Sequence, residues 1–384
     1  MPNQSISFPL GPIDLLIFQS TSFCNLDCKY CYLPDRLNKS KMDLKNIEIT
    51  IKKIIEENLI DTKFSIVWHA GEPMVMSLGF YKQVYELIKT LIPKDIEVTQ
   101  HIQTNATLIN DDWCKFFIES GMKVGVSLDG PEHVNDRNRV YRNGRGSFEK
   151  IIKGINFLKK HNIEFSVISV LTDYSLDYPD EIYNFFFNLG NVRSLGFNMD
   201  EEDGVNKKST LTDEVSPKLK SFWRRIFQLQ LSPDRYLHIR EIFAFNELLL
   251  KGNFSVNPLT WTQMTQPLKI LTIDTNGSFS TFSPELIGMK DERFNDFNFG
   301  NIHTDKFESV RDNKKFNLVF NEIVDGIKKC KSECEYYSFC GGGAPSNKLY
   351  ENGSFDTTET NYCKFSKKIL VDSFLEEIKL NLDV

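Results

Sequence analysis

The stretch from Ile13 to Cys31 reads IDLLIFQSTSFCNLDCKYC and leads from an apolar run directly into three cysteines. The run Ile13–Thr21 has the length and composition of a buried strand. Cys24, Cys28 and Cys31 follow it with the spacing Cys-x3-Cys-x2-Cys. Three thiols in one short loop are typical of metal ligands, and a role as buried structural thiols explains them poorly. The stretch therefore predicts a strand that carries metal ligands at its carboxyl end.

Composition and charge narrow the class of protein. The 384 residues are 41% hydrophobic and 26% charged, as in a soluble globular protein. No apolar run approaches the ~18 residues that span a bilayer. The first residues, MPNQSISFPLGP, show no basic region followed by an apolar stretch, so we do not expect a secretory signal. The net charge of −6 and the pI of 5.7 argue against nucleic acid. We therefore expect a cytoplasmic protein with no membrane or nucleic-acid partner, whose clustered cysteines bind metal in a reducing compartment.

The first 200 residues alternate strand-like runs with stretches of helical periodicity. The predicted strands are Ile13–Thr21, Phe64–His69, Glu97–Thr104, Lys123–Leu128, Glu164–Thr172 and Ser194–Met199. The predicted helices are Leu44–Leu59, Phe80–Ile92, Asp111–Ser120, Phe148–His161 and Tyr178–Leu189. This alternation is typical of parallel βα units, so the predicted fold class is α/β, with a partial (β/α)6 barrel. Ligands bind at the carboxyl ends of the strands in such folds.

The pattern changes after the sixth predicted strand. A charged segment, Glu201–Ser209, precedes two helical stretches. Ile270–Asp274 and Ser278–Phe282, joined by Asn276-Gly277, predict a hairpin, and Ser366–Leu380 predicts a final amphipathic helix. We therefore expect three parts, which are a barrel (10–200), a helical linker region (201–266) and a small α+β domain with a C-terminal helix (267–384).

The first cysteine group suits an iron–sulfur cluster with one open position. A cubane [4Fe–4S] cluster has four ligand positions, and thiolates normally fill all of them. Cys24, Cys28 and Cys31 would fill three, which leaves one iron free to bind a substrate, as catalytic zinc sites keep an open position. The alternative is a zinc knuckle with a distant fourth ligand, such as His69.

With Tyr30 as the aromatic residue before the last cysteine, this motif resembles the signature of the radical S-adenosylmethionine (SAM) superfamily. The resemblance implies that Cys24, Cys28 and Cys31 hold a [4Fe–4S] cluster whose open iron is chelated by the methionine part of SAM. It also implies an electron donor, such as flavodoxin or ferredoxin, and reductive cleavage of SAM to a 5′-deoxyadenosyl radical that removes a substrate hydrogen. The cofactors then carry the chemistry, and the protein positions and shields them.

The same resemblance implies a set of SAM-binding residues. They are Tyr30, Gly71, Glu72, Asn105, Ser127, Asp129 and Arg139. Gly71-Glu72 resembles part of a Gly-Gly-Glu-Pro motif that binds the amino group of SAM. Ser127 and Asp129 resemble a Ser-x-Asp-Gly motif that reaches the ribose and methionine part. Arg139 resembles an arginine that pairs with the SAM carboxylate in sulfatase maturases, a role that suits its planar guanidinium.

A second cysteine group reads Cys330-x3-Cys334-x5-Cys340-x22-Cys363. Four thiolates complete an iron–sulfur cluster, although four cysteines also bind zinc tetrahedrally. Together with the N-terminal half, the group resembles the SPASM domain of radical SAM peptide maturases, which holds two auxiliary clusters.

The SPASM resemblance is incomplete, because two cysteine positions of the family pattern carry Phe282 and Ala344. The ligands that are missing are those of the first auxiliary cluster. The resemblance therefore implies one auxiliary [4Fe–4S] cluster on Cys330, Cys334, Cys340 and Cys363, and two [4Fe–4S] clusters in the chain.

Three stretches, Gly196–Glu202, Thr281–Leu286 and Cys340–Lys348, resemble a narrower group, the Grr/XYE-type maturases that make three-residue cyclophanes. This implies a bond from an aromatic ring carbon to the β-carbon of a residue two positions later in a ribosomal precursor peptide. Another SPASM maturase, forming thioethers or formylglycine, is the alternative, and Phe282 and Ala344 count against it. An iron–sulfur electron carrier and a zinc-stapled peptide-binding module also stay open.

Restoring the aromatic ring after such a crosslink requires loss of one proton and one electron. In sulfatase maturases an Asp acts as the base, and its position is Ser283 here. Glu285, two residues later, is our candidate base, and Asp200, Glu201 and Glu202 are further acidic residues after the sixth strand. The auxiliary cluster is the candidate electron acceptor.

Overall fold

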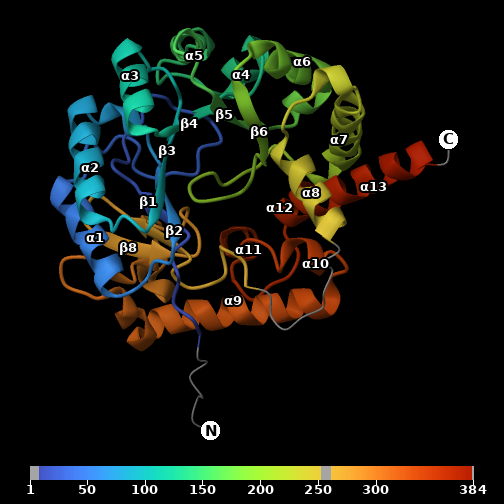
Figure 1. The fold of residues 1–384 in the computed structure, drawn as a ribbon. Helices are drawn as coiled ribbons and strands as arrows, with labels where there is room; N and C mark the ends of the chain where they lie inside the picture. Colours follow the sequence, from blue (N-terminus) through green and yellow to red (C-terminus); the bar gives the residue numbers. More distant parts are fainter. Residues whose placement is uncertain (1–7, 252–260, 383–384) are drawn as a thin grey trace.

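Six parallel strands form the body of the molecule (Figure 1). A computed structural model describes residues 8–251 and 261–382. The six strands are β1 (Leu15–Phe18), β2 (Lys63–Trp68), β3 (Glu97–Thr104), β4 (Lys123–Ser127), β5 (Phe165–Leu171) and β6 (Val192–Met199). Each pairs in parallel with the next in chain order. The predicted partial barrel is confirmed, because all six strands lie where the alternation of the sequence placed them.

Helices cover the outside of these strands (Figure 1). The five predicted ones are α1 (Leu44–Glu56), α2 (Leu78–Leu91), α3 (Asp111–Ser120), α5 (Phe148–Lys160) and α6 (Pro179–Leu189). Polar N-caps begin three of them, since Asp43, Ser77 and Asn110 accept hydrogen bonds from backbone N–H groups of the first turn. A further short helix, α4 (Glu132–Asn138), was not predicted.

The core between helices and strands fixes the carboxyl ends of β1 and β2. The Trp68 ring stacks on Phe18, with 5.1 Å between ring centroids, and meets Tyr81 of α2 edge-on at 5.2 Å. All three side chains are fully buried. Aromatic contacts of this kind add to the stabilisation from buried area. The loops that follow β1 and β2 therefore begin from a rigid base.

The C-terminal part continues the same sheet. β7 (Ile270–Ile273) pairs in parallel with β1, and β8 (Ser278–Thr281) and the short β9 (Gly300–Asn301) follow antiparallel. Gly277 has a φ of +80°, which glycine adopts without strain in the predicted hairpin turn. The hairpin is confirmed, and it is joined to the barrel strands in one nine-stranded sheet.

The remaining helices surround this extended sheet. They are α7 (Ser216–Gln230), α8 (Arg240–Lys251), α9 (Lys314–Glu333), α10 (Tyr337–Cys340), α11 (Pro345–Asn352), α12 (Asn361–Cys363) and α13 (Ile369–Leu382). α13 packs on α7, where the rings of Phe374 and Trp223 lie 5.9 Å apart. Across the described ranges, none of the helices has the length and apolar character that a membrane span requires. The expected division into three parts stays a prediction.

Candidate active site

The three N-terminal cysteines line one cavity of about 280 Å³ together with side chains from the ends of β2 to β6. Cys24, Cys28 and Cys31 are free thiols on the loop after β1. Burial raises the pKa of Cys24 to about 12 and that of Cys28 to about 11. Thiolates in this setting require a neighbouring cation, which iron would supply. The donor type, number and burial therefore fit a [4Fe–4S] cluster.

The loop after β2 places Glu72 against this cavity. Its carboxylate accepts hydrogen bonds from the Met74 backbone N–H at 2.9 Å, the Thr104 hydroxyl at 2.7 Å and the Asn105 backbone N–H at 2.7 Å. Gly71 has a φ of +59°, and a Cβ there would lie 2.6 Å from the carbonyl oxygens of residues 21 and 23. Only glycine therefore allows the loop after β2 to approach the cysteine loop so closely.

Asp129 anchors two of the residues that line the cavity, Tyr30 and Arg139. Its carboxylate accepts hydrogen bonds from the Tyr30 hydroxyl at 2.5 Å, Arg139 Nε at 2.9 Å and the Val170 backbone N–H at 3.0 Å. Asp129 and Arg139 are both buried. Of the seven predicted SAM residues, Asp129 alone does not line the cavity. Its direct contact with SAM stays a prediction. In the structure Asp129 holds the side chains of Tyr30 and Arg139 in place through hydrogen bonds.

Asn105 and Ser127 complete the predicted set. Asn105 Nδ2 donates to Asn25 Oδ1 at 2.7 Å and lies 3.9 Å from Cys24 Sγ, which links β3 to the cysteine loop. Ser127 Oγ accepts a hydrogen bond from Gln103 Nε2 at 2.9 Å. The sequence reasoning missed Gln103, which also lines the cavity. Gln103 lies two residues before Asn105, and side chains at this spacing lie on the same side of an extended chain. This spacing could have predicted that Gln103 also faces the cavity.

Acidic side chains line the same cavity at the ends of β6 and β8. They include Glu285, whose carboxylate accepts a hydrogen bond from Ser283, and Glu201, whose carboxylate accepts one from Asn347 Nδ2. Burial raises the pKa of Glu285, and it raises that of Glu201 to about 8. Glu202 lines a different cavity. The structure therefore brings the candidate base Glu285 to the predicted SAM residues and separates Glu202 from them.

His69 lies beside the SAM residues as a partly buried, neutral side chain. Its Nε2 is 3.2 Å from the Tyr32 hydroxyl. Burial lowers its pKa to about 4, so the imidazole carries no charge at neutral pH. This arrangement suits a hydrogen-bonded structural histidine.

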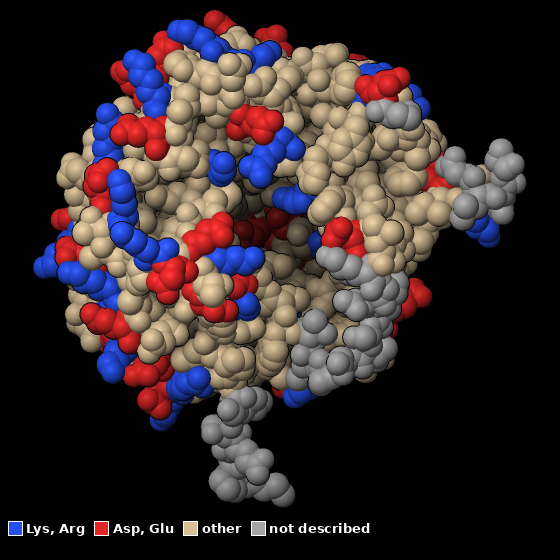
Figure 2. Space-filling model, viewed as in Figure 1, with Lys and Arg blue, Asp and Glu red and all other residues tan. Residues whose placement is uncertain are grey.

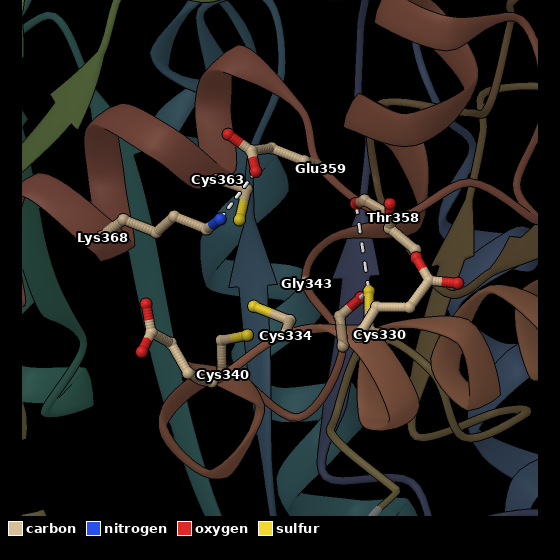
Figure 3. A pocket seen from close by; sticks show the side chains of 11 residues that line it. Cys330, Cys334, Cys340, Gly343, Thr358, Glu359, Cys363 and Lys368 are labelled. Atoms are coloured by element: carbon tan, nitrogen blue, oxygen red, sulfur yellow. Dashed lines mark hydrogen bonds and ion pairs between the residues drawn. The ribbon is translucent and has the colours of Figure 1, made fainter.

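The four C-terminal cysteines surround a second cavity of about 410 Å³ (Figure 3). In Figure 3 the sulfur atoms of Cys334, Cys340 and Cys363 point toward a common space, and Cys330 lies beside it. The buried Lys348 places Nζ 3.4 Å from Cys330 Sγ. Across residues 8–251 and 261–382, no group of three or more His, Cys, Asp or Glu side chains is arranged to hold a single metal ion. Four thiols around a cavity of this kind fit the donor set of a [4Fe–4S] cluster.

Comparison with known proteins agrees with this geometry. The family model of the radical SAM superfamily matches residues 18–186. An uncharacterized protein of Synechocystis sp. is 41% identical over 360 residues, covering 92% of this chain and 89% of that protein. A serine-type anaerobic sulfatase-maturating enzyme of Bacteroides thetaiotaomicron is 28% identical over 374 residues, covering 92% and 87%.

Two solved structures share the fold. Native anSMEcpe with bound AdoMet superimposes with a TM-score of 0.75 and 25% identity, covering 98% of this chain and all of that one. Streptococcus suis SuiB bound to the precursor peptide SuiA gives a TM-score of 0.64 at 16% identity, covering 93% and 76%.

A partial barrel with three cysteines after its first strand, in a cavity that is also lined by polar side chains at the ends of β2, β3, β4 and β6, defines a class of iron–sulfur enzymes that cleave SAM. The chain belongs to the radical SAM superfamily. It is a radical SAM enzyme, and its cofactors are SAM and [4Fe–4S] clusters.

Proposed function

We propose that this enzyme joins an aromatic ring carbon to the β-carbon of a residue two positions later in a ribosomally made precursor peptide. The observation that carries the proposal is the replacement of the first auxiliary site by apolar packing. Phe282 is fully buried and stacks on Phe316, with 5.7 Å between ring centroids, and Ala344 is buried as well. This supports a single auxiliary cluster, in contrast to maturases that keep the first site.

A peptide substrate is supported by the names of the related proteins. The Bacteroides relative matures sulfatases, and SuiB has been solved with its precursor peptide. We infer that the substrate of this chain is likewise a peptide, and that a flavodoxin or ferredoxin reduces its cluster.

The residues around the cavity are assigned roles that their geometry allows. Cys24, Cys28 and Cys31 would hold the first cluster, which together with bound SAM supplies a radical able to remove a hydrogen atom. Arg139 keeps its Nη groups for the SAM carboxylate, because Asp129 takes only Nε. Glu285 would receive the proton released when the aromatic ring is restored, since it lies in the same cavity. The second cluster would accept the accompanying electron.

Sulfatase maturation is the second candidate function. The 28% identity to the Bacteroides sulfatase-maturating enzyme across most of both chains favours it. The Ser283 hydroxyl counts against it, because serine cannot replace the carboxylate base expected at that position.

The test is anaerobic co-expression with a short precursor encoded near the gene, followed by tandem mass spectrometry. We expect the peptide to lose two hydrogen atoms per crosslink and to resist backbone fragmentation inside the three-residue ring. Replacing its aromatic residue with Ala should abolish crosslinking. A crosslink that survives this change and instead requires a precursor cysteine would refute the cyclophane proposal in favour of a thioether.

A further inference from the structure

Five carboxyl groups line the cavity that also holds the predicted SAM residues, and besides Glu72 and Asp200 they are Glu201, Asp203 and Glu285. We call the last three, Glu201, Asp203 and Glu285, the acidic cluster. Glu201 and Asp203 follow β6, and Glu285 follows β8. Figure 2 shows a hollow near the centre of this face with acidic side chains inside it. The acidic cluster is therefore part of the reaction cavity and is not spread over the outer surface.

The backbone holds Asp203 next to the cysteine loop. The Val205 N–H donates to the Tyr32 carbonyl at 2.9 Å. Gly204 has a φ of +54°, and a Cβ there would lie only 2.3 Å from the same carbonyl oxygen. This close approach places Asp203 beside the residue that follows Cys31. A group bound at the acidic cluster would therefore lie near the iron–sulfur site.

Within the described residues no cation forms an ion pair with the acidic cluster, although the charge of Lys207 acts on Asp203 from a longer distance and partly offsets the rise in its pKa that burial causes. In the part of the chain that the structure describes, none of its three carboxyls forms an ion pair, and Asp203 Oδ1 is buried without a hydrogen-bond partner. Asp203 is only 4% exposed. The two arginines that line the cavity pair with other carboxylates, Arg36 with Asp27 and Arg139 with Asp129. Lys207 is exposed and lies over the ring of Tyr350.

Asp200 provides a contrast on the same loop. It also lines the cavity, but its carboxylate accepts hydrogen bonds from the Thr210 N–H at 2.8 Å, the Thr210 hydroxyl at 2.7 Å and Asn206 Nδ2 at 3.2 Å. Both carboxylate oxygens of Asp200 thus have partners in the protein, whereas Asp203 receives a backbone hydrogen bond from Gly204 but its Oδ1 has no partner. Burying a carboxyl oxygen without a partner costs free energy, and a bound cation would remove that cost.

We propose that the acidic cluster is a receptor for a cationic group of the substrate, either a lysine or arginine side chain or the peptide's α-amine. The proposal rests on the proposed function as a peptide maturase and specifies its substrate class. Because the acidic cluster and the SAM residues share one cavity, the cation belongs to the segment of the peptide that reacts.

Selection from a peptide library tests this proposal without knowledge of the natural precursor. Holoenzyme reconstituted with both clusters and SAM is immobilised anaerobically. It is then exposed to randomised hexapeptides that carry one fixed tryptophan, with free or acetylated N-termini. Retained peptides are sequenced by mass spectrometry. We expect lysine and arginine to be enriched about tenfold over their apolar counterparts, as for a desolvated charge pair. Retention that requires a free N-terminus, with no preference for lysine or arginine, would instead identify the α-amine as the bound cation.

Variants test whether the enrichment of cationic peptides depends on the acidic cluster or on general peptide binding. Asp203→Asn and, as a second variant in case the first does not fold, Glu201→Gln should lose the enrichment while keeping SAM affinity. Glu202→Gln is the matched control and should keep the enrichment, because Glu202 lines a different cavity. Retention of peptides without any preference for a cation, or an enrichment that Asp203→Asn leaves intact, would overturn the receptor and leave the maturase function standing. Retention of no peptide at all would overturn both.

Discussion

Replacing Asp129 with Asn should disturb the active site more than any exposed charge substitution. Asparagine keeps the shape of the side chain but removes its charge, so Arg139 would remain buried without a counter-ion. The amide also has one acceptor oxygen, where the carboxylate now accepts from Tyr30, Arg139 and Val170 at 2.5, 2.9 and 3.0 Å. Breaking a buried ion pair from one side costs ~3–5 kcal/mol, and we expect a loss of this size in the free energy of unfolding.

The assay is urea unfolding of the cluster-free protein, combined with equilibrium binding of SAM to the reconstituted protein. Asp180→Asn is the matched control, because Asp180 pairs with Arg225 at 2.6 Å while both side chains are almost half exposed. An exposed pair of this kind contributes at most ~1 kcal/mol. The double variant Asp129→Asn/Arg139→Leu should recover part of the lost stability, because it removes the unpaired charge, but not the SAM affinity. A loss below ~1 kcal/mol in Asp129→Asn, with unchanged SAM affinity, would refute the anchoring role.

Three further predictions address the two iron–sulfur clusters and Glu201 of the acidic cluster. Anaerobic reconstitution should give roughly eight irons per chain, as two [4Fe–4S] clusters require. Replacing the three cysteines of the first loop with Ala should halve this number. A count near twelve irons per chain, or zinc at the second site, would contradict the prediction of two clusters. Lys348→Met should lower the reduction potential of the auxiliary cluster, because it removes a positive charge 3.4 Å from Cys330 Sγ. The potential is measured in a redox titration followed by electron paramagnetic resonance, and an unchanged value would show that the charge of Lys348 does not act on the cluster. Because burial raises the pKa of Glu201 from its ordinary 4.5 to about 8, the native state binds a proton that the unfolded state has lost, and the free energy of unfolding should fall as pH rises between these two values. Glu201→Gln should flatten that fall in thermal unfolding, and equal pH slopes in both proteins would count against the raised pKa.

Features that depend on local sequence were predictable. The spacing of Cys24, Cys28 and Cys31 and the two-residue and 3.6-residue periods of the barrel are readable without a structure. The sequence also predicted that the polar residues after the strands lie close together, because parallel strands bring their carboxyl ends to one edge of the sheet. Helix α4 was missed since its seven residues are too few to show a helical period.

Features that depend on long-range contacts could not be predicted. Glu201–Ser209 has the composition of a solvated linker, yet the contact of its backbone with Tyr32 buries Asp203 in the cavity. Asp129 lies in a motif that predicted contact with SAM, but its hydrogen bonds to Arg139 and Val170 depend on how two distant segments pack. Charge and periodicity carry no information on such contacts.

The parallel pairing of β7 with β1 limits how this enzyme can be divided. Each β1 residue from Leu15 to Phe18 has a partner between Ile270 and Ile273, more than 250 positions later in the chain. A fragment ending at residue 200 would leave β1 as a bare edge whose apolar, buried side chains and free backbone groups could template aggregation. Efforts to express the barrel by itself, or to graft another C-terminal region onto it, would therefore have to supply a strand in place of β7.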